Sequence, residues 1–188
     1  MLSIGITGSY ASGKSYLLNL LHKEGYKIFS CDKCVGDLYK QQSIRDQILE
    51  LAPRLEVFDI KKLAQEFYDD DNIRKKIEDL IHPQVLASIL NFQKNNILEK
   101  FIFTEVPLLF EAGWEHYFDY VITTFCAEER RLTQARLKIN FDEKIYQKLE
   151  KIQMSQSEKM KRADFVINTD VKMLELKSQI LNLLEKLQ

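Results

Sequence analysis

The stretch Gly8-Ser9-Tyr10-Ala11-Ser12-Gly13-Lys14-Ser15 has the spacing of a phosphate-binding loop, G-x-x-x-x-G-K-[ST]. Its glycines allow backbone conformations in which successive N–H groups point at phosphate oxygens. A helix that begins near Gly13 adds the positive end of its dipole to the same site. In this pattern Lys14 reaches the β- and γ-phosphates, and the Ser15 hydroxyl holds Mg²⁺. The loop therefore predicts a site for a nucleoside triphosphate and its metal ion.

The residues on both sides supply the elements that such a loop requires. A short apolar segment with β-branched residues, 2–7, precedes it and predicts a strand. Leucines at helical spacing follow and predict a helix over 13–23, for which Gly25 is a suitable left-handed stop. A chance glycine turn before an ordinary helix is the alternative interpretation. The order strand, glycine loop, helix favours phosphate binding over that alternative.

Composition limits the class of protein. A chain of 188 residues fits one domain, 1–188, and its 27 basic against 28 acidic side chains predict neither a nucleic-acid partner nor a membrane surface. No apolar run approaches the roughly 18 residues that a membrane helix needs. Three cysteines, an odd number, do not indicate a secreted disulfide framework. We expect a cytoplasmic protein.

Four further short apolar segments predict strands: 26–30, 101–106, 120–125 and 165–168. Helical patterns separate them, which predicts an α/β fold with a five-stranded parallel sheet covered by helices on both sides. A final helix is expected over 171–187. Its predicted core-facing stripe consists of Leu174, Ile180, Leu181, Leu184 and Leu187.

Nearly seventy residues separate the second and third strands, although a crossover helix needs only about a dozen. The segment 33–100 contains amphipathic helical patterns at 35–41, 43–51, 59–68 and 72–98, the last with Pro83 as the expected point of a break. We expect a helical insertion that binds the second substrate. The run Asp69-Asp70-Asp71 within it is interpreted as a solvated turn and helix N-terminus and not as a metal cluster.

Asp32 follows the second strand. Because ligands of open parallel sheets lie beyond the carboxyl ends of the strands, Asp32 is expected near the phosphate loop. Its spacing alone leaves two roles open, a catalytic carboxylate and a helix cap. The neighbouring pattern Cys31-x-x-Cys34 allows a redox or zinc site as an alternative, but the histidines and Cys126 have no metal-site spacing.

A phosphate loop alone does not separate kinases from GTPases. The guanine motif Asn-Lys-x-Asp is absent, since its nearest approach, Ile167-Asn168-Thr169-Asp170, lacks the lysine. The small size, the helical insertion and a basic stretch near 128–150 favour a small-molecule kinase with a short closing lid that excludes water. The alternatives are a nucleoside or nucleotide kinase, and a regulator that binds nucleotide without turnover.

Specific segments resemble the dephospho-CoA kinase family over nearly the whole chain. They are the loop 8–15, Asp32, Ile81-His82-Pro83, Glu105-Val106-Pro107-Leu108-Leu109-Phe110-Glu111 and Arg162-Ala163-Asp164-Phe165-Val166-Ile167-Asn168. The resemblance implies a P-loop NTPase fold. It also implies transfer of the γ-phosphoryl group of Mg·ATP to the ribose 3′-hydroxyl of dephospho-coenzyme A, the last step of coenzyme A synthesis.

The resemblance also implies roles for individual residues. Asp32 orients the acceptor hydroxyl and takes its proton, while Lys14, Arg136 and Lys138 neutralise charge on the transferring group. Nucleotide binding falls to Gly8, Ala11, Ser12, Gly13, Lys14, Ser15, Tyr16 and Asn168. Acceptor binding falls to His82, Pro107, Leu108, Leu109 and Glu111, and metal binding to Ser15 and Glu105.

Several positions depart from the family pattern. Ser30 stands where members commonly have the first aspartate of Asp-x-Asp, and Tyr16 stands where a threonine usually follows the metal-binding serine. Gln134 and Lys138 stand where the family usually has arginines, and a lysine lacks the bidentate guanidinium fork. The lid prediction is therefore Arg136 and Lys138 acting as a pair, against a solvated helix face as the alternative.

Overall fold

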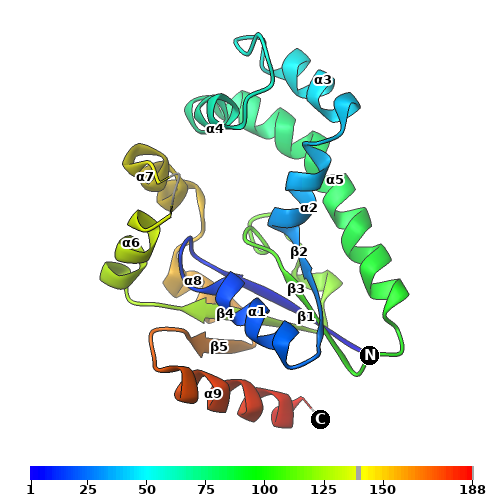
Figure 1. The fold of residues 1–188 in the computed structure, drawn as a ribbon, viewed down its shortest axis with the longest axis vertical. Helices are drawn as coiled ribbons and strands as arrows, with labels where there is room; N and C mark the ends of the chain where they lie inside the picture. The colour runs from blue at the N-terminus through cyan, green and yellow to red at the C-terminus, as the bar shows by residue number, and fades with distance from the viewer. Residues whose placement is uncertain (139–140, 188) are drawn as a thin grey trace.

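The computed structural model describes residues 1–138 and 141–187. Its five strands form one parallel sheet in the order β2-β3-β1-β4-β5 (Figure 1), which confirms the predicted sheet. The strands are β1 (Leu2–Gly8), β2 (Lys27–Ser30), β3 (Phe101–Glu105), β4 (Tyr120–Phe125) and β5 (Phe165–Asn168). The strand that carries the phosphate loop, β1, is central. Gly8 therefore leaves the sheet between the carboxyl ends of β3 and β4.

Nine helices lie in the described part of the chain. They are α1 (Lys14–Lys23), α2 (Cys31–Leu38), α3 (Gln42–Leu51), α4 (Ile60–Asp69), α5 (Asp71–Asn95), α6 (Glu128–Arg136), α7 (Glu143–Ile152), α8 (Gln156–Arg162) and α9 (Met173–Lys186). A 3₁₀ turn, η1, spans Glu115–Tyr117. In the residues that the structure describes, no helix is long and apolar enough to cross a membrane.

The two faces of the sheet are covered by different helices because side chains alternate along each strand. Ile4 and Ile6 of β1 point to one face and pack with leucines of α1 and α9 in one core cluster. Ser3 and Thr7 point to the other face, where Gln93 of α5 and Lys159 of α8 contact them. The predicted covering of the sheet on both sides is thus confirmed.

The segment between β2 and β3 forms the four helices α2 to α5 (Figure 1). Helices α3 and α4 lie beyond the carboxyl ends of the strands, and α5 runs back beside the sheet, where Gln93 contacts Ser3. The expected break near Pro83 is wrong, since α5 continues through it. A buried stripe at every fourth residue, Ile73, Ile77, Ile81, Val85 and Ile89, supports the helix on both sides of the proline. The same helix ends at Asn95, short of the predicted Leu98, which is fully exposed.

Asp70 caps α5 by accepting hydrogen bonds from the N–H groups of Asn72 and Ile73, at 2.9 and 3.2 Å. Asp69 pairs with Lys148, and Asp71 pairs with Arg74. Within residues 1–138 and 141–187, no group of three or more His, Cys, Asp or Glu has a metal-site arrangement. Asp70 and Asp71 thus lie at the N-terminus of α5 as predicted, whereas Asp69 is the last residue of α4.

The core-facing stripe predicted for the last helix is partly wrong. Leu174 and Leu181 are 82% and 61% exposed, while Leu176, Ile180, Leu183, Leu184 and Leu187 are buried. The physical reason is angular: with 3.6 residues per turn, Leu174 lies about 120° around the helix from Ile180, so the two cannot share a face. Leu181 lies on the same line as Leu174.

The charged stretch between β4 and β5 forms three helices, α6, α7 and α8. The predicted lid, 128–150, contains α6 and most of α7, and its positions 139 and 140 lie outside the described residues. Helix α7 contacts α4 of the insertion, so these two segments meet over the carboxyl end of the sheet. The protein thereby encloses a space above the phosphate loop.

Candidate active site

The phosphate loop turns on residues in unusual backbone conformations. Gly8 and Gly13 have φ of +148° and +84°, and a Cβ on Gly13 would lie 2.9 Å from the Thr169 side chain. Ala11 also has a positive φ, +59°, which strains a residue with a side chain. The Ser12 hydroxyl hydrogen-bonds that of Thr124 at 2.6 Å and joins the loop to β4.

Lys14 folds back over the loop that precedes it. Its Nζ donates to the carbonyl oxygens of Gly8 and Ser9, both at 2.9 Å, and the side chain is buried. Burial lowers the pKa of Lys14 to about 8, against the opposing attraction of Glu105. A phosphate arriving in the loop would favour the charged ammonium form of this lysine.

Glu105, at the end of β3, is 2% exposed and is held by two serines. Ser15 Oγ donates to its Oε1 at 2.9 Å, and Ser30 Oγ donates to its Oε2 at 3.0 Å. Ser30 also caps α2 by accepting from the Lys33 N–H at 3.4 Å. The Ser30 hydroxyl, at the position where the resemblance implied an aspartate, thus orients Glu105.

Helix α2 begins at Cys31, directly after β2, whereas the sequence predicted its start at Val35. Asp32 therefore lies in the first turn of this helix and not on a loop after the strand. Asp32 keeps some contact with solvent, but its carboxylate lies among the side chains that line a cavity. That partial burial, and secondly the negative charge of Glu105, raise the pKa of Asp32.

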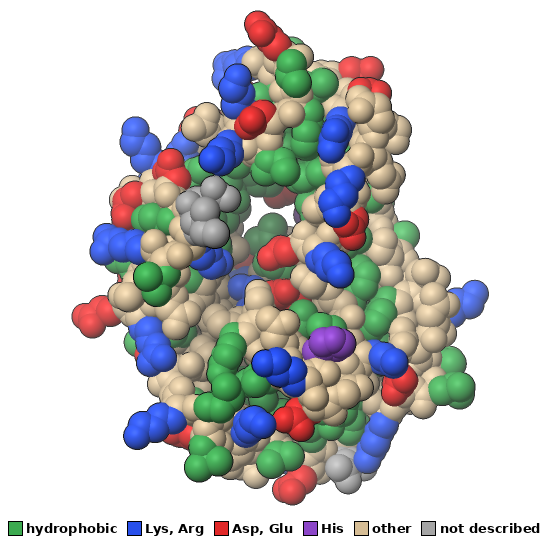
Figure 2. Space-filling view, in the orientation of Figure 1, with side chains coloured by type: hydrophobic (Ala, Val, Ile, Leu, Met, Phe, Trp, Pro, Cys, Tyr) green, Lys and Arg blue, Asp and Glu red, His purple; other side chains and the backbone are tan. Residues whose placement is uncertain are grey.

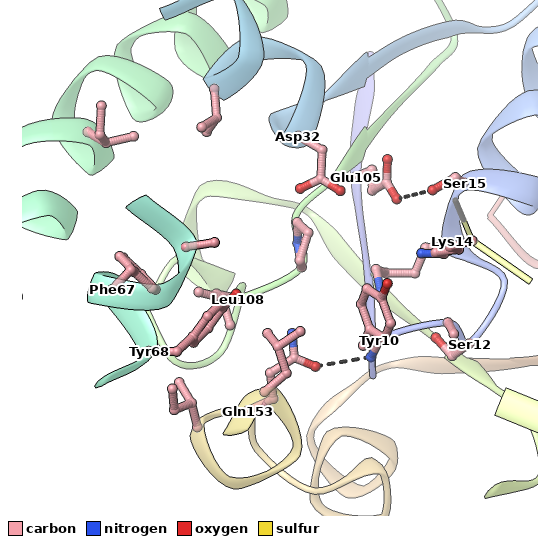
Figure 3. A pocket seen from close by; sticks show the side chains of 18 of the residues that line it. Tyr10, Ser12, Lys14, Ser15, Asp32, Phe67, Tyr68, Glu105, Leu108 and Gln153 are labelled. Carbon is pink, nitrogen blue, oxygen red and sulfur yellow. Dashed lines mark hydrogen bonds between the residues drawn. The ribbon is translucent and has the colours of Figure 1, made fainter. Parts of the chain in front are cut away.

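A single cavity of about 550 Å³ joins these groups. Figure 2 shows the surface hollowed at the centre of this face, and Figure 3 shows the side chains inside. Lys14, Ser15, Asp32 and Glu105 lie at one end, and Phe67, Tyr68 and Leu108 lie toward the other (Figure 3). Further apolar lining comes from α2, α4, α5 and α7: Val35, Leu63, Ile77, Ile81, Leu149 and Ile152. The cavity accommodates a ligand that is charged at one end and apolar along much of its length.

The structure brings most of the predicted site residues to this cavity. The lining includes Ala11, Ser12, Gly13, Lys14, Ser15, Tyr16, Asp32, His82, Glu105, Pro107, Leu108 and Lys138. His82 also packs edge-on against Trp114, with ring centroids 5.3 Å apart, and burial lowers its pKa. The hydroxyl of Tyr16 points away, toward the Met173 sulfur at 3.2 Å.

Five predicted site residues lie outside the cavity lining: Gly8, Leu109, Glu111, Arg136 and Asn168. Leu109 is fully buried in the core, and Arg136 reaches Glu143 at 3.4 Å on the surface. The Asn168 side chain accepts from the Asp170 N–H at 2.9 Å in the turn after β5. Their assigned roles stay predictions; of the two basic residues predicted to act together in the lid, Lys138 lines the cavity and Arg136 does not.

Side chains of the lid, and Gln153 just after it, lie beside the phosphate loop. Gln134 lines the cavity with Lys138, whose ammonium lies 4.1 Å from the centre of the Tyr10 ring. Gln153 Oε1 accepts from the Tyr10 N–H at 3.0 Å, as the dashed line in Figure 3 marks. Arg131 is buried and makes a bidentate pair with Glu150, both bonds at 2.9 Å. These contacts join α6 and α7 to the phosphate loop.

No pattern in the sequence indicates Lys159, a buried charge behind the loop. This lysine of α8 has no exposed surface and donates to the Pro107 carbonyl at 2.8 Å, with Glu111 at 3.0 Å and the Thr7 hydroxyl at 3.5 Å. Glu111 also accepts from the Met154 N–H at 2.8 Å. Lys159 thereby links β1, the turn after β3 and the junction of α7 with α8. No sequence spacing connects positions so far apart.

The cysteine pair has no metal partner in the described part of the chain. Cys31 and Cys34 are free thiols, and burial, followed by the charge of Asp32, raises the pKa of Cys31. A raised pKa keeps the thiol protonated and poorly nucleophilic, so it does not favour the redox alternative.

Comparison with known proteins identifies the family. The family model for dephospho-CoA kinase matches residues 2–175. Dephospho-CoA kinase of Rickettsia typhi is 46% identical over 188 residues, covering 100% of this chain and 98% of that protein. A crystal structure from Thermus thermophilus superimposes with a TM-score of 0.83 at 26% identity, covering 100% and 98% of the two chains.

Dephospho-CoA kinase from Campylobacter jejuni shares the fold, with a TM-score of 0.64 at 23% identity over 98% of this chain and 96% of that one. The resemblance seen in the loop, the Pro107–Glu111 turn and the segment before β5 therefore extends over almost the whole sequence. This chain belongs to the dephospho-CoA kinase family.

Proposed function

We propose that the protein transfers the γ-phosphoryl group of ATP to the ribose 3′-hydroxyl of dephospho-coenzyme A. The observation that carries this proposal is the common cavity of Lys14 and Asp32, one on the phosphate loop and the other in the first turn of α2. The loop offers backbone N–H groups and a lysine to the triphosphate. Asp32 offers a carboxylate to the acceptor's 3′-hydroxyl, which would lie between Asp32 and the triphosphate.

The polar end of the cavity receives the phosphates, and the apolar end receives the acceptor. Dephospho-coenzyme A carries a long pantetheine arm, for which the lining from α4, α5 and α7 provides apolar walls. The helical segment 33–100 is accordingly the acceptor-binding part, and 128–150 is the lid. Contact between α4 and α7 supports closure over both substrates, which protects ATP from water.

Asp32 accepts the proton of the 3′-hydroxyl as the oxygen forms its bond to the γ-phosphorus. The bond to the bridging oxygen breaks, and ADP leaves with that electron pair. Because its pKa is raised, Asp32 is a stronger base than an ordinary aspartate. Lys14 and Lys138 neutralise the charge that spreads over the γ-phosphoryl oxygens in the loose transition state.

The residues around Glu105 fit a magnesium ion. They present two hydroxyls and two carboxylates, from Ser15, Ser30, Glu105 and Asp32, which are the hard oxygen donors that Mg²⁺ prefers. Magnesium usually takes only one or two protein ligands beside phosphates and water, so a larger cluster is not needed. Ser15 and Glu105 would hold the ion, and the bound ion supplies charge neutralisation on the β- and γ-phosphates.

The decisive experiment supplies Mg·ATP together with one acceptor at a time and measures the mass of each product. We expect dephospho-coenzyme A to gain the mass of one phosphoryl group. Phosphorylation of a member of a nucleoside panel instead would favour a nucleoside kinase. Nucleotide binding without any acceptor-dependent turnover would favour a regulator, and either result contradicts the proposed reaction.

A further inference from the structure

Tyr10, the third residue of the phosphate loop, contacts side chains of the lid and the side chain of Gln153, which follows the lid. Its N–H donates to Gln153, and its carbonyl oxygen accepts from Arg131 at 3.3 Å. Its ring packs edge-on against Tyr146, with centroids 6.0 Å apart, and faces the ammonium of Lys138. Both the backbone and the ring of one loop residue are thus held by α6, α7 and the residues that flank them.

The contact between Tyr10 and Lys138 has the geometry of a cation–π interaction. The distance from Nζ to the ring centroid is 4.1 Å, well inside the range of about 6 Å in which such contacts are attractive. No ion pair of Lys138 with an acidic side chain occurs among residues 1–138 and 141–187. Among the residues that the structure describes, the Tyr10 ring is the side chain that contacts this ammonium.

Lys138 is electrostatically close to both ends of the proposed phosphoryl path. Burial is the largest cause of both pKa shifts: it lowers the pKa of Lys14 and raises that of Asp32. The charge of Lys138 has a smaller effect and lowers both pKa values. The ammonium therefore acts on the lysine of the loop and on the carboxylate across the cavity. A cation in this position is suited to stabilise charge on the transferring group.

A lysine needs more help than an arginine to act there. Its compact charge sits on a flexible four-carbon stem and lacks a planar fork that fixes its geometry on phosphate oxygens. At position 138 of this chain the Tyr10 ring lies beneath the lysine ammonium. The Tyr10 ring restricts the lysine side chain and leaves its charge in place. An acidic partner would neutralise that charge.

We propose that Tyr10 is a positioning residue for phosphoryl transfer, whose ring holds the Lys138 ammonium over the γ-phosphate position. The proposal rests on the proposed function, in which Lys138 stabilises the transferring group. Hydrogen bonds of the Tyr10 backbone, from its N–H to Gln153 and from Arg131 to its carbonyl oxygen, fix the position from which the ring extends. The lid and the loop then present this lysine as one unit.

The test compares Tyr10→Phe, which keeps the ring, with Tyr10→Leu, which removes it. In the presence of Lys138 we expect kcat of the phenylalanine variant to exceed that of the leucine variant about fivefold, with KM for dephospho-coenzyme A the same in both. Fivefold corresponds to about 1 kcal/mol. When Lys138→Met is added to each, the ratio falls to about one, since the ring then has no cation to hold.

Lys144→Met is the matched control, because it removes an exposed lysine of α7 that does not line the cavity. In this background the fivefold ratio must persist. A ratio that stays at five with Lys138→Met would overturn the proposal, since packing of the ring against Tyr146 would then explain the effect. A higher kcat for Tyr10→Leu would also overturn it, because the ring would be holding Lys138 away from the phosphate.

A binding measurement makes the outcome independent of the acceptor. The ratio of the Kd for ADP to the Kd for a non-hydrolysable ATP analogue reports contacts with the γ-phosphate. We expect Tyr10→Leu to lower this ratio about fivefold relative to Tyr10→Phe, only when Lys138 is present. Equal ratios overturn the role of Tyr10. Failure of the parent protein to phosphorylate dephospho-coenzyme A contradicts the proposed reaction instead. The ratios of Kd values in the Tyr10 variants can still be compared in that case.

Discussion

Replacing Lys159 with methionine tests whether the buried network behind the phosphate loop stabilises the fold. The side chain of Lys159 has no exposed surface, and that of its partner Glu111 is 18% exposed. The substitution keeps most of the apolar volume and removes the ammonium. Burial lowers the pKa of Lys159, and the attraction of Glu111 opposes that shift.

The expected loss follows from the contacts that disappear. Among the described residues, the carboxylate of Glu111 retains the Met154 N–H as its one donor, and the carbonyl of Pro107 loses a charged donor at 2.8 Å. Removing one partner of a buried pair typically costs about 3 to 5 kcal/mol. Because Glu111 keeps one donor and some contact with water, we expect the lower end, about 3 kcal/mol. For a chain of this length that loss lowers Tm by roughly 6 to 12 °C.

The assay is urea unfolding followed by circular dichroism, with the free energy of unfolding taken from the midpoint and slope. Lys177→Met is the matched control, since its pair with Glu24 is 49% and 55% exposed and should cost less than about 1 kcal/mol. Adding Glu111→Gln to Lys159→Met removes the unpaired charge while keeping an acceptor for Met154. The double variant should therefore be more stable than Lys159→Met alone.

Two results would refute this reasoning. A loss for Lys159→Met no larger than that for Lys177→Met would mean that water replaces the ammonium at Glu111 and Pro107. A double variant less stable than Lys159→Met would mean that the unpaired carboxylate is not the source of the cost.

Three further predictions concern the loop and Asp32. Ala11→Gly should raise the free energy of unfolding by about 0.5 kcal/mol, because relief of strain at φ +59° exceeds the added entropy of the unfolded chain. Urea unfolding measures this free energy, and a loss of stability contradicts the prediction. The affinity for ADP should fall about tenfold from pH 7 to pH 9, because Lys14, with a pKa of about 8 in the free protein, must take up a proton to bind phosphate. Calorimetry at each pH measures this, and Lys14→Arg should remove the pH dependence; a flat profile in the parent contradicts the lowered pKa. Asp32→Asn should lower kcat by a factor on the order of 100 or more, while the Kd for ATP stays within about threefold of the parent value. A coupled assay of ADP release measures kcat. Unchanged turnover removes Asp32 from the mechanism.

Local patterns in the sequence determined the sheet, the phosphate loop and the family. The loop depends on glycines at fixed spacing between a strand and a helix, and these interactions span few residues. The predicted strands agree with the observed ones to within one residue at almost every end, because buried parallel strands are short apolar runs bounded by polar residues. The place of Asp32 after a strand also predicted that it lies near the phosphate loop, and Asp32 and Lys14 line the same cavity.

Only the tertiary structure decided which charged side chains line the cavity and which form ion pairs elsewhere. Arg131 and Arg136 are similar in sequence context, yet one is buried against Glu150 and the other pairs at the surface with Glu143. Lys159 reaches Thr7 across 152 positions of sequence, and Tyr10 meets Lys138 across the cavity. Burial and partners of a long side chain depend on what packs around it. That packing is set by the whole fold, so no local pattern of residues reveals it.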